Sequence, residues 1–339
     1  MQRRFTFFKK TLFALIPTLL LLGLAELSFR HIDPQIDGSP VRLIDLNNSA
    51  FYREGERKII FARPLSESDD ALGFKCVPGR HTIQVDYRST LLKKRLQFAA
   101  TIGEDGYRTT GNSSNRENPE IWIMGCSSTW GWLVEDEETF PWLVQQEMPK
   151  YHVRNLGISG YGNVHALIQI ELVEKQNSRI PEIAVFAYNE FHLPRNVAAP
   201  SWIRASRSAS ENSGIVQSYP RAQFSGEEGL KITMVKIEEM EKEDPPKGVM
   251  LQATKAVFDR IKVLCDRMGI TPILAFQTGG KNDPVVLHCR KAGFSIVDIS
   301  VLASDECTFA PIDYHPNALA HSLYAKKLLS HIRKLNDRP

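Results

Sequence analysis

From residue 121 onward, short apolar runs alternate with longer segments whose apolar residues recur at helical spacing. The short runs predict buried strands, and they cover Ile121–Met124, His152–Leu156, Ile183–Ala187, Thr271–Phe276 and Ser295–Ile299. The longer segments predict helices over Thr139–Met148, Val164–Gln176, Val249–Met268 and Ala318–Leu335. Thr139 is a typical helix N-cap ahead of Pro141, and Gly269 is a typical helix stop. Strands that alternate with helices predict an α/β fold, with a parallel sheet between two helical layers.

The first 30 residues have a different pattern. Arg3, Arg4, Lys9 and Lys10 form a basic start, and residues 11–25 are apolar and uncharged. This order is typical of an export signal. The run is short for a spanning helix, which needs about 20 apolar residues, but residues 27–29 extend it. We expect an uncleaved signal anchor over residues 1–30, with the rest of the chain outside the cytoplasm. Cleavage near Gly23–Ala25 would instead give a secreted protein.

Two further segments flank or interrupt the α/β pattern. Residues 31–118 contain strand-like alternation at His81–Tyr87 and Leu96–Ile102, which predicts a linker and a small β-rich lead-in. The α/β domain is then expected to span 119–339. Residues 199–248 are rich in Ser, Glu, Lys and Pro and have few large apolar residues apart from Trp202. This composition favours a solvated loop, with a lid over the site as the alternative.

Composition excludes several classes of protein. The chain has 339 residues, 42% of them hydrophobic and 24% charged, with a net charge of +3. So small a charge does not indicate a nucleic-acid partner. The five cysteines lack C-x-x-C spacing, which disfavours a zinc site or a disulfide framework. Gly157, Gly160 and Gly162 follow a strand, but their spacing does not fit a dinucleotide fingerprint. We therefore expect no metal and no organic cofactor.

Two remote segments carry the candidate chemistry. The strand at 121–124 runs into Gly-Cys-Ser, which places Ser127 at the carboxyl edge of the sheet, where open α/β sheets bind ligands. A serine hydroxyl becomes nucleophilic when a base takes its proton, and a histidine with an orienting carboxylate is the usual solution. His315, two residues after Asp313, supplies both groups near the other end of the chain. Ser127 as a plain helix cap, and His315 as a capping residue, are the alternatives.

Acyl transfer also needs hydrogen-bond donors for an oxyanion. The backbone N–H of Ser127 is one candidate. Gly160 follows the second predicted strand, and Asn189 follows the third with a carboxamide side chain. Each has an alternative as a turn former, but all three lie at strand ends on one edge of the predicted sheet. Cys126 is a rival nucleophile, although only one of two adjacent side chains can face His315.

These segments together resemble the SGNH hydrolases, also called the GDSL family of lipases and esterases, in a membrane-anchored bacterial form. The first family block, Gly-Asp-Ser-x-Thr, corresponds to Gly125–Thr129, and the second-block glycine corresponds to Gly160. The third block, Gly-x-Asn-Asp, corresponds to Ala187–Glu190, and the last block corresponds to Asp313 and His315. The resemblance covers about residues 121–333. It implies a three-layer, flavodoxin-like α/β/α fold, a Ser127–His315–Asp313 triad, and an oxyanion hole from Ser127, Gly160 and Asn189.

The chain departs from the family pattern at several places. Cys126, Ala187 and Glu190 replace an Asp, a Gly and an Asp of the family blocks. The family acid usually lies three residues before the histidine, where this chain has Ile312. An Asp two residues before the histidine is similar to members that O-acetylate polysaccharides.

The sequence predicts a serine esterase that acts on an acyl ester outside the cytoplasm. One alternative is an O-acyltransferase, for example an O-acetyltransferase, that modifies an envelope or exported glycan. A second is a non-catalytic SGNH-fold binding protein. The expected partners are an ester-bearing small molecule, lipid or glycan and, through the N-terminal helix, a membrane. The substrate, the acyl chain and the oligomeric state stay open.

Overall fold

The computed structural model describes residues 55–89, 92–111, 117–176, 178–210, 218–239, 242–301, 304 and 306–336. The predicted signal anchor over residues 1–30 and the beginning of the lead-in lie outside the described residues. Among the helices within these ranges, none combines the length and the apolar character that crossing a bilayer requires.

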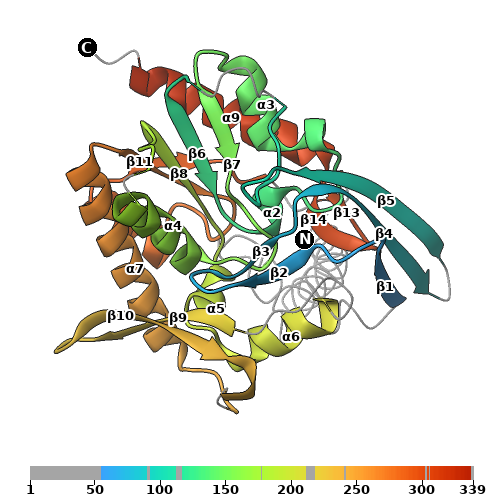
Figure 1. Cartoon of the computed structure of the whole chain (residues 1–339), viewed down its shortest axis with the longest axis horizontal. Helices are drawn as coiled ribbons and strands as arrows, with labels where there is room; N and C mark the ends of the chain where they lie inside the picture. Colours follow the sequence, from blue (N-terminus) through green and yellow to red (C-terminus); the bar gives the residue numbers. More distant parts are fainter. Residues whose placement is uncertain are drawn as a thin grey trace, which may run out of the picture. The chain divides into compact units, whose positions relative to one another are not determined.

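A parallel sheet forms the centre of the described part of the chain (Figure 1). Its strands are β6 (Glu120–Met124), β7 (His152–Asn155), β8 (Ile183–Tyr188), β11 (Thr271–Phe276) and β12 (Ser295–Asp298). All five predicted strands are confirmed to within about a residue at each end. The strand order is β12-β11-β8-β6-β7, and every neighbouring pair is parallel. The chain therefore changes direction between β6 and β8, and the carboxyl ends of strands at such a switch point form a binding crevice.

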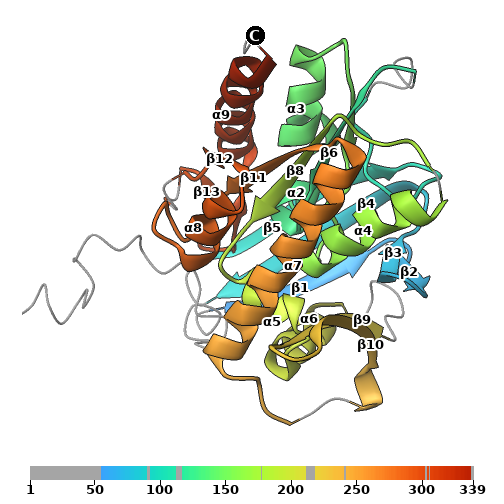
Figure 2. The same ribbon diagram turned by 90° about the vertical axis from the view of Figure 1, so that its left-hand side faces the viewer.

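Helices cover both faces of this sheet (Figure 2). One face carries α3 (Phe140–Glu147) and α9 (Ala318–Asn336), and the other carries α4 (Asn163–Gln176), α7 (Lys247–Met268) and α8 (Pro284–Lys291). Alternate residues of β6 face the two layers: Ile121 and Ile123 pack with α3 and α9, whereas Trp122 and Met124 pack in the opposite core. Because both faces are buried, the strand is apolar throughout. The predicted three-layer α/β/α arrangement is confirmed for the described residues.

The predicted helix boundaries have the expected caps. The Thr139 side chain accepts a hydrogen bond from the backbone N–H of Trp142, with Pro141 in the first turn of α3. A cap of this kind stabilises a helix by about 1 kcal/mol. Gly269 ends α7 in the left-handed region, at φ 71°.

The β-rich lead-in joins the edge of the parallel sheet. It contains an antiparallel sheet of β1 (Gly55–Phe61), β4 (Gly79–Ser89) and β5 (Lys93–Ile102), and a hairpin of β2 (Ser66–Asp69) and β3 (Gly73–Cys76). Arg108 forms a β-bridge to Ile102 on one side and to Asn155 of β7 on the other. Buried residues of the lead-in, including Phe74 and Phe98, lie in the same hydrophobic cluster as Trp130. The lead-in and the α/β layers therefore share one core.

The segment at 199–248 is not a solvated loop, which corrects that expectation. It contains α6 (Pro200–Ser210), a hairpin of β9 (Ser218–Ser225) and β10 (Gly229–Lys236), and a short 3-10 helix, η3 (Ile237–Glu239). Tyr219 and Ala222 of the hairpin are buried in the main cluster. Only Tyr219, Pro220 and Ala222 of β9 and Val235 of β10 are buried, so this hairpin needs few large apolar residues. Because the segment has few apolar residues, its two strands could not be recognised from the sequence pattern.

The remaining elements are short and lie around the carboxyl edge of the sheet. They are α2 (Ser127–Trp130), a 3-10 helix η2 (Asp136–Glu138), α5 (His192–Asn196), β13 (Thr308–Phe309) and β14 (Asp313–Pro316). None was predicted from the sequence, because each is too short to show a hydrophobic period.

Candidate active site

The proposed nucleophile lies on a sharp turn directly after β6. Cys126 is the N-cap of α2 with an extended backbone, and Ser127 is the first residue of the helix. The backbone N–H at the first position of a helix has no acceptor within that helix. Ser127 is 7% exposed, and it lies just after the carboxyl end of β6, beside the switch point.

The glycine of this turn is required by close packing. A Cβ placed at Gly125 would lie 2.2 Å from Oγ1 of Thr129 and 2.9 Å from Cβ of Ala187. Both contacts are below the distance that real side chains tolerate, so any larger residue would displace the nucleophile turn from β8. The Gly-x-Ser-x-Thr spacing therefore has a physical cause: Thr129 folds back over Gly125.

His315 and Asp313 meet Ser127 from the other end of the chain. Nε2 of His315 lies 2.8 Å from Oγ of Ser127, and Nδ1 of His315 lies 2.5 Å from Oδ1 of Asp313. The Asp313 carboxylate also accepts the backbone N–H of His315 at 2.9 Å. The structure thus brings together three predicted residues that are separated by up to 188 positions.

The surroundings of the imidazole favour one tautomer. Asp313 is buried at 2% exposure, and its carboxylate accepts hydrogen bonds, so Nδ1 of His315 carries a proton and donates it. Nε2 is then the acceptor that faces the Ser127 hydroxyl. Ile312, at the position of the usual family acid, is buried in the hydrophobic core. Asp313, two residues before His315 in the same short strand β14, therefore supplies the carboxylate that contacts Nδ1.

An aromatic cluster packs beside the imidazole. The ring centroids of Trp132 and His315 are 6.1 Å apart at an interplanar angle of 50°. Trp132 in turn contacts Phe98 of β5 and Trp130 of α2, at centroid distances of 5.4 Å and 6.2 Å. Phe98 of the lead-in therefore packs on the aromatic ring that contacts His315.

The two other predicted oxyanion donors lie at the same sheet edge. Gly160 has φ +96°, a conformation that favours glycine, and a Cβ there would lie 3.3 Å from Cζ of Phe74. Asn189 directly follows β8 and is 2% exposed. Its Nδ2 lies 3.7 Å from Sγ of Cys126, the residue before Ser127. Asn189 is thus adjacent to the nucleophile turn across the switch point.

Gln277 is a site residue that sequence reasoning missed. It directly follows β11 and is 3% exposed, and its Oε1 accepts a hydrogen bond of 2.7 Å from Nδ2 of Asn189. This bond fixes one amide N–H of Asn189 and thereby sets the direction of the second. Its position after a predicted strand on the same edge was the signal that would have found it.

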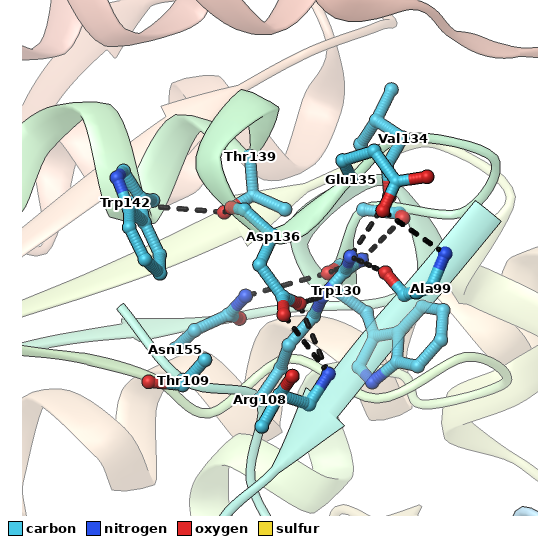
Figure 3. A network of polar contacts seen from close by, with 12 residues as sticks. Ala99, Arg108, Thr109, Trp130, Val134, Glu135, Asp136, Thr139, Trp142 and Asn155 are labelled. Atoms are coloured by element: carbon cyan, nitrogen blue, oxygen red, sulfur yellow. Dashed lines mark hydrogen bonds and ion pairs between the residues drawn. The ribbon is translucent and has the colours of Figure 1, made fainter. Parts of the chain in front are cut away.

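Arg108 is a second missed residue, and it holds the loop that follows α2 (Figure 3). Its Nε donates to Oδ1 of Asp136 at 2.7 Å. Its Nη1 donates to the carbonyls of Trp130 and Gly131, and its Nη2 donates to those of Ala99 and Val134. All five N–H donors of this buried guanidinium are therefore used. Burial lowers the pKa of Arg108, and the Asp136 carboxylate opposes that shift.

This clamp stabilises a strained backbone conformation. Leu133 has φ 68°, which is rare for a residue with a branched side chain. Two of the carbonyls that Arg108 binds, those of Gly131 and Val134, flank it. Strain of this kind persists where the surroundings over-determine the conformation. Arg108 therefore fixes both the end of α2 and the aromatic residue Trp132 that packs on His315.

The geometry favours Ser127 over Cys126 as the nucleophile. Cys126 is fully buried, and its Sγ faces the Asn189 carboxamide, whereas Nε2 of His315 faces the Ser127 hydroxyl. The chemistry available to this arrangement is proton transfer from a serine hydroxyl to a carboxylate-oriented imidazole. Within residues 55–336 as far as they are described, no group of three or more His, Cys, Asp or Glu is arranged to hold a metal ion.

Comparisons with known proteins give fold-level similarities. No protein-family model matches the chain, and no curated protein sequence matches it. Among solved structures, it is similar to a lipolytic protein of the G-D-S-L family from Veillonella parvula, with 12% identity over 62% of this chain and 96% of that one, at a TM-score of 0.35. It is also similar to the psychrotrophic esterase EstA from Pseudoalteromonas, with 12% identity over 65% and 100% of the two chains, at a TM-score of 0.39.

A third similar structure is a catalytic mutant of Axe2, an acetylxylan esterase from Geobacillus stearothermophilus, with 13% identity over 63% and 94% of the two chains, at a TM-score of 0.37. All three proteins are named as lipolytic proteins or esterases. Identities and TM-scores this low assign no activity to the present chain.

Proposed function

We propose that the protein is a serine-dependent ester hydrolase with Ser127 as nucleophile, His315 as general base and Asp313 as the carboxylate that orients the base. The observation that carries this proposal is the continuous chain of contacts from Oγ of Ser127 through His315 to Asp313, at 2.8 Å and 2.5 Å. The distance between Ser127 and His315 is within the range for proton transfer, and the short contact with Asp313 orients the imidazole.

The reaction follows from these contacts. Nε2 of His315 takes the Ser127 proton while Oγ attacks the ester carbonyl, and the buried Asp313 carboxylate stabilises the imidazolium that forms. The imidazolium then gives its proton to the leaving alcohol, which leaves an acyl group on Ser127. A water molecule, deprotonated by the same imidazole, releases the acid and restores the serine.

The oxyanion of each tetrahedral intermediate needs donors in place before the reaction begins. We assign this role to the backbone N–H groups of Ser127 and Gly160 and to the Asn189 side chain. Gln277 accepts one amide N–H of Asn189 at 2.7 Å, and the other, which donates to Sγ of Cys126 over 3.7 Å, is the one we assign to the oxyanion. Because Gln277 is itself buried, the carboxamide loses little freedom when the transition state forms.

Turnover of a short-chain chromogenic ester tests the proposal. Ser127→Ala is expected to abolish turnover, whereas Cys126→Ala, its matched neighbour, is expected to retain most of it. Turnover that survives Ser127→Ala and disappears in Cys126→Ala would reverse the assignment.

Products made with and without an oligosaccharide acceptor also identify the acyl recipient: free acid indicates hydrolysis, and an acylated acceptor indicates transfer.

We also propose that the enzyme acts outside the cytoplasm, anchored by residues 1–30. The basic start and the uncharged run at residues 11–25 support this location. Fusion of a reporter enzyme that is active only after export to the carboxyl end of the chain provides the test. Export-dependent activity that pellets with membranes is expected. A fusion protein that is made in full but shows no reporter activity would contradict the location.

A further inference from the structure

A second buried arginine lies beside the candidate site, and its surroundings differ from those of Arg108. Arg195 of α5 is 7% exposed, and its guanidinium carbon lies 4.6 Å from the ring centre of Phe191 and 4.1 Å from that of Trp202. Contacts of this kind favour a cation between the two aromatic faces. Two rings and a helix thus fix the guanidinium in one place.

The guanidinium binds the loop that carries Gly160. Nη1 of Arg195 donates to the carbonyl of Tyr161, the next residue, at 3.1 Å. The following glycine is packed against the same helix, since a Cβ on Gly162 would lie 3.0 Å from Cβ of Arg195. Trp202 also reaches this loop, with Cζ2 3.9 Å from a Cβ placed at Gly160. Arg195 and Trp202 therefore determine where the Gly160 N–H lies.

The positive charge of Arg195 has no carboxylate partner in the described ranges. Its Nε is buried without a hydrogen-bond partner. Burial lowers its pKa, and the side chain that opposes this shift is the Cys126 thiol, not an acid. Cys126 also lies 3.7 Å from Nδ2 of Asn189. The guanidinium thus contacts the residue that follows Gly160, and its charge acts on the residue that precedes Ser127.

We propose that Arg195 is the positioning residue of the oxyanion site: it fixes the Gly160 loop against the nucleophile turn and keeps a positive charge beside it. This inference rests on the proposed function. A buried cation without a carboxylate partner destabilises the resting protein. The same charge becomes favourable when negative charge develops nearby in a site of low dielectric. The arrangement thus stabilises the transition state more than the ground state, which is the condition for a faster reaction.

Kinetics and stability of Arg195→Met and Arg195→Lys test this role, with Arg204→Met as the matched control, because Arg204 lies on the exposed face of α6. Arg195→Met is expected to lower kcat by about 10²-fold with little change in KM, as for loss of an oxyanion donor. Its Tm is expected to stay at or above the wild-type value, because the Met side chain removes a buried charge. Arg195→Lys keeps the charge but not the planar donor set, so an intermediate kcat is expected. Arg204→Met should match the wild type.

Several results would overturn the proposal. One is a folded Arg195→Met protein whose kcat stays within about twofold of the wild type. Another is a loss that appears only in KM, which would make Arg195 a ground-state substrate ligand. A third is a fall in Tm that parallels the fall in kcat, which would make its role purely structural. If Arg195→Met does not fold, Arg195→Lys decides, and a wild-type kcat there would overturn the role. Wild-type protein that hydrolyses no ester would contradict the proposed function, and the role of Arg195 with it.

Discussion

His321 provides a quantitative test of the packing between α3 and α9. Its imidazole is fully buried, Nδ1 accepts the backbone N–H of Phe140 at 3.1 Å, and the ring stacks on Phe140 at a centroid distance of 5.9 Å. Burial lowers the pKa of His321 from 6.5 to about 3. The bond from Phe140 favours the same neutral form, because it occupies the lone pair that a proton would take.

The sign of the effect follows from linkage. The pKa of His321 is lower in the folded than in the unfolded protein, so unfolding takes up a proton at pH values between about 3 and 6.5. The stability from a neutral His321 is complete above the unfolded pKa and is lost as pH falls toward the folded value. Between about pH 7.5 and about pH 5, one such group costs about 2 kcal/mol of unfolding free energy.

Replacing His321 by Gln removes this titration while leaving an oxygen that can accept the Phe140 N–H. Urea unfolding of both proteins across the same pH series measures the difference. The wild type is expected to lose about 2 kcal/mol more than His321→Gln between about pH 7.5 and about pH 5. Other titrating groups cancel in this difference. Parallel pH profiles for the two proteins would refute a neutral, buried His321.

Three further predictions concern the site and its supports. Asp313→Asn presents an amide to Nδ1 of His315 and favours the wrong tautomer, so kcat should fall by roughly 10²–10⁴-fold in a folded protein; a wild-type rate constant would remove Asp313 from the mechanism. Asn189→Ala should lower kcat by about 10²–10³-fold with wild-type circular dichroism, and undiminished kcat would exclude it from the oxyanion hole. Arg108→Met leaves Asp136 buried without its ion-pair partner, so urea unfolding should show a loss of about 3–5 kcal/mol, and unchanged stability would contradict the clamp.

The sheet could be predicted from the sequence because its strands are buried on both faces. Such strands appear as short apolar runs, and the chain order of runs and helices indicated the α/β class. The hairpin at 218–236 could not be found in this way, because few of its residues, among them Tyr219 and Ala222, meet the core. The short helix that begins at Ser127 was also missed, since one turn has no measurable period.

Local motifs located the candidate site but not its supports. Ser127 follows an apolar run in the sequence, and His315 follows a carboxylate at Asp313. This local context identified both residues as candidates. Arg108 and Arg195 have no such context in the sequence, and Gln277 has only its position after a predicted strand. Their importance depends on contacts with carbonyls, rings and amides from remote segments, which only the folded arrangement brings together. The catalytic roles assigned to Ser127 and His315 stay predictions until activity is measured.

The reactivity of Ser127 is the central claim, and a fluorophosphonate probe measures it directly. Peptide mapping of the labelled wild-type protein should find one adduct, on Oγ of Ser127, and labelling should become much slower in His315→Ala because the base is missing. An adduct on Cys126, or a folded wild-type protein that the probe leaves unlabelled, would contradict the account.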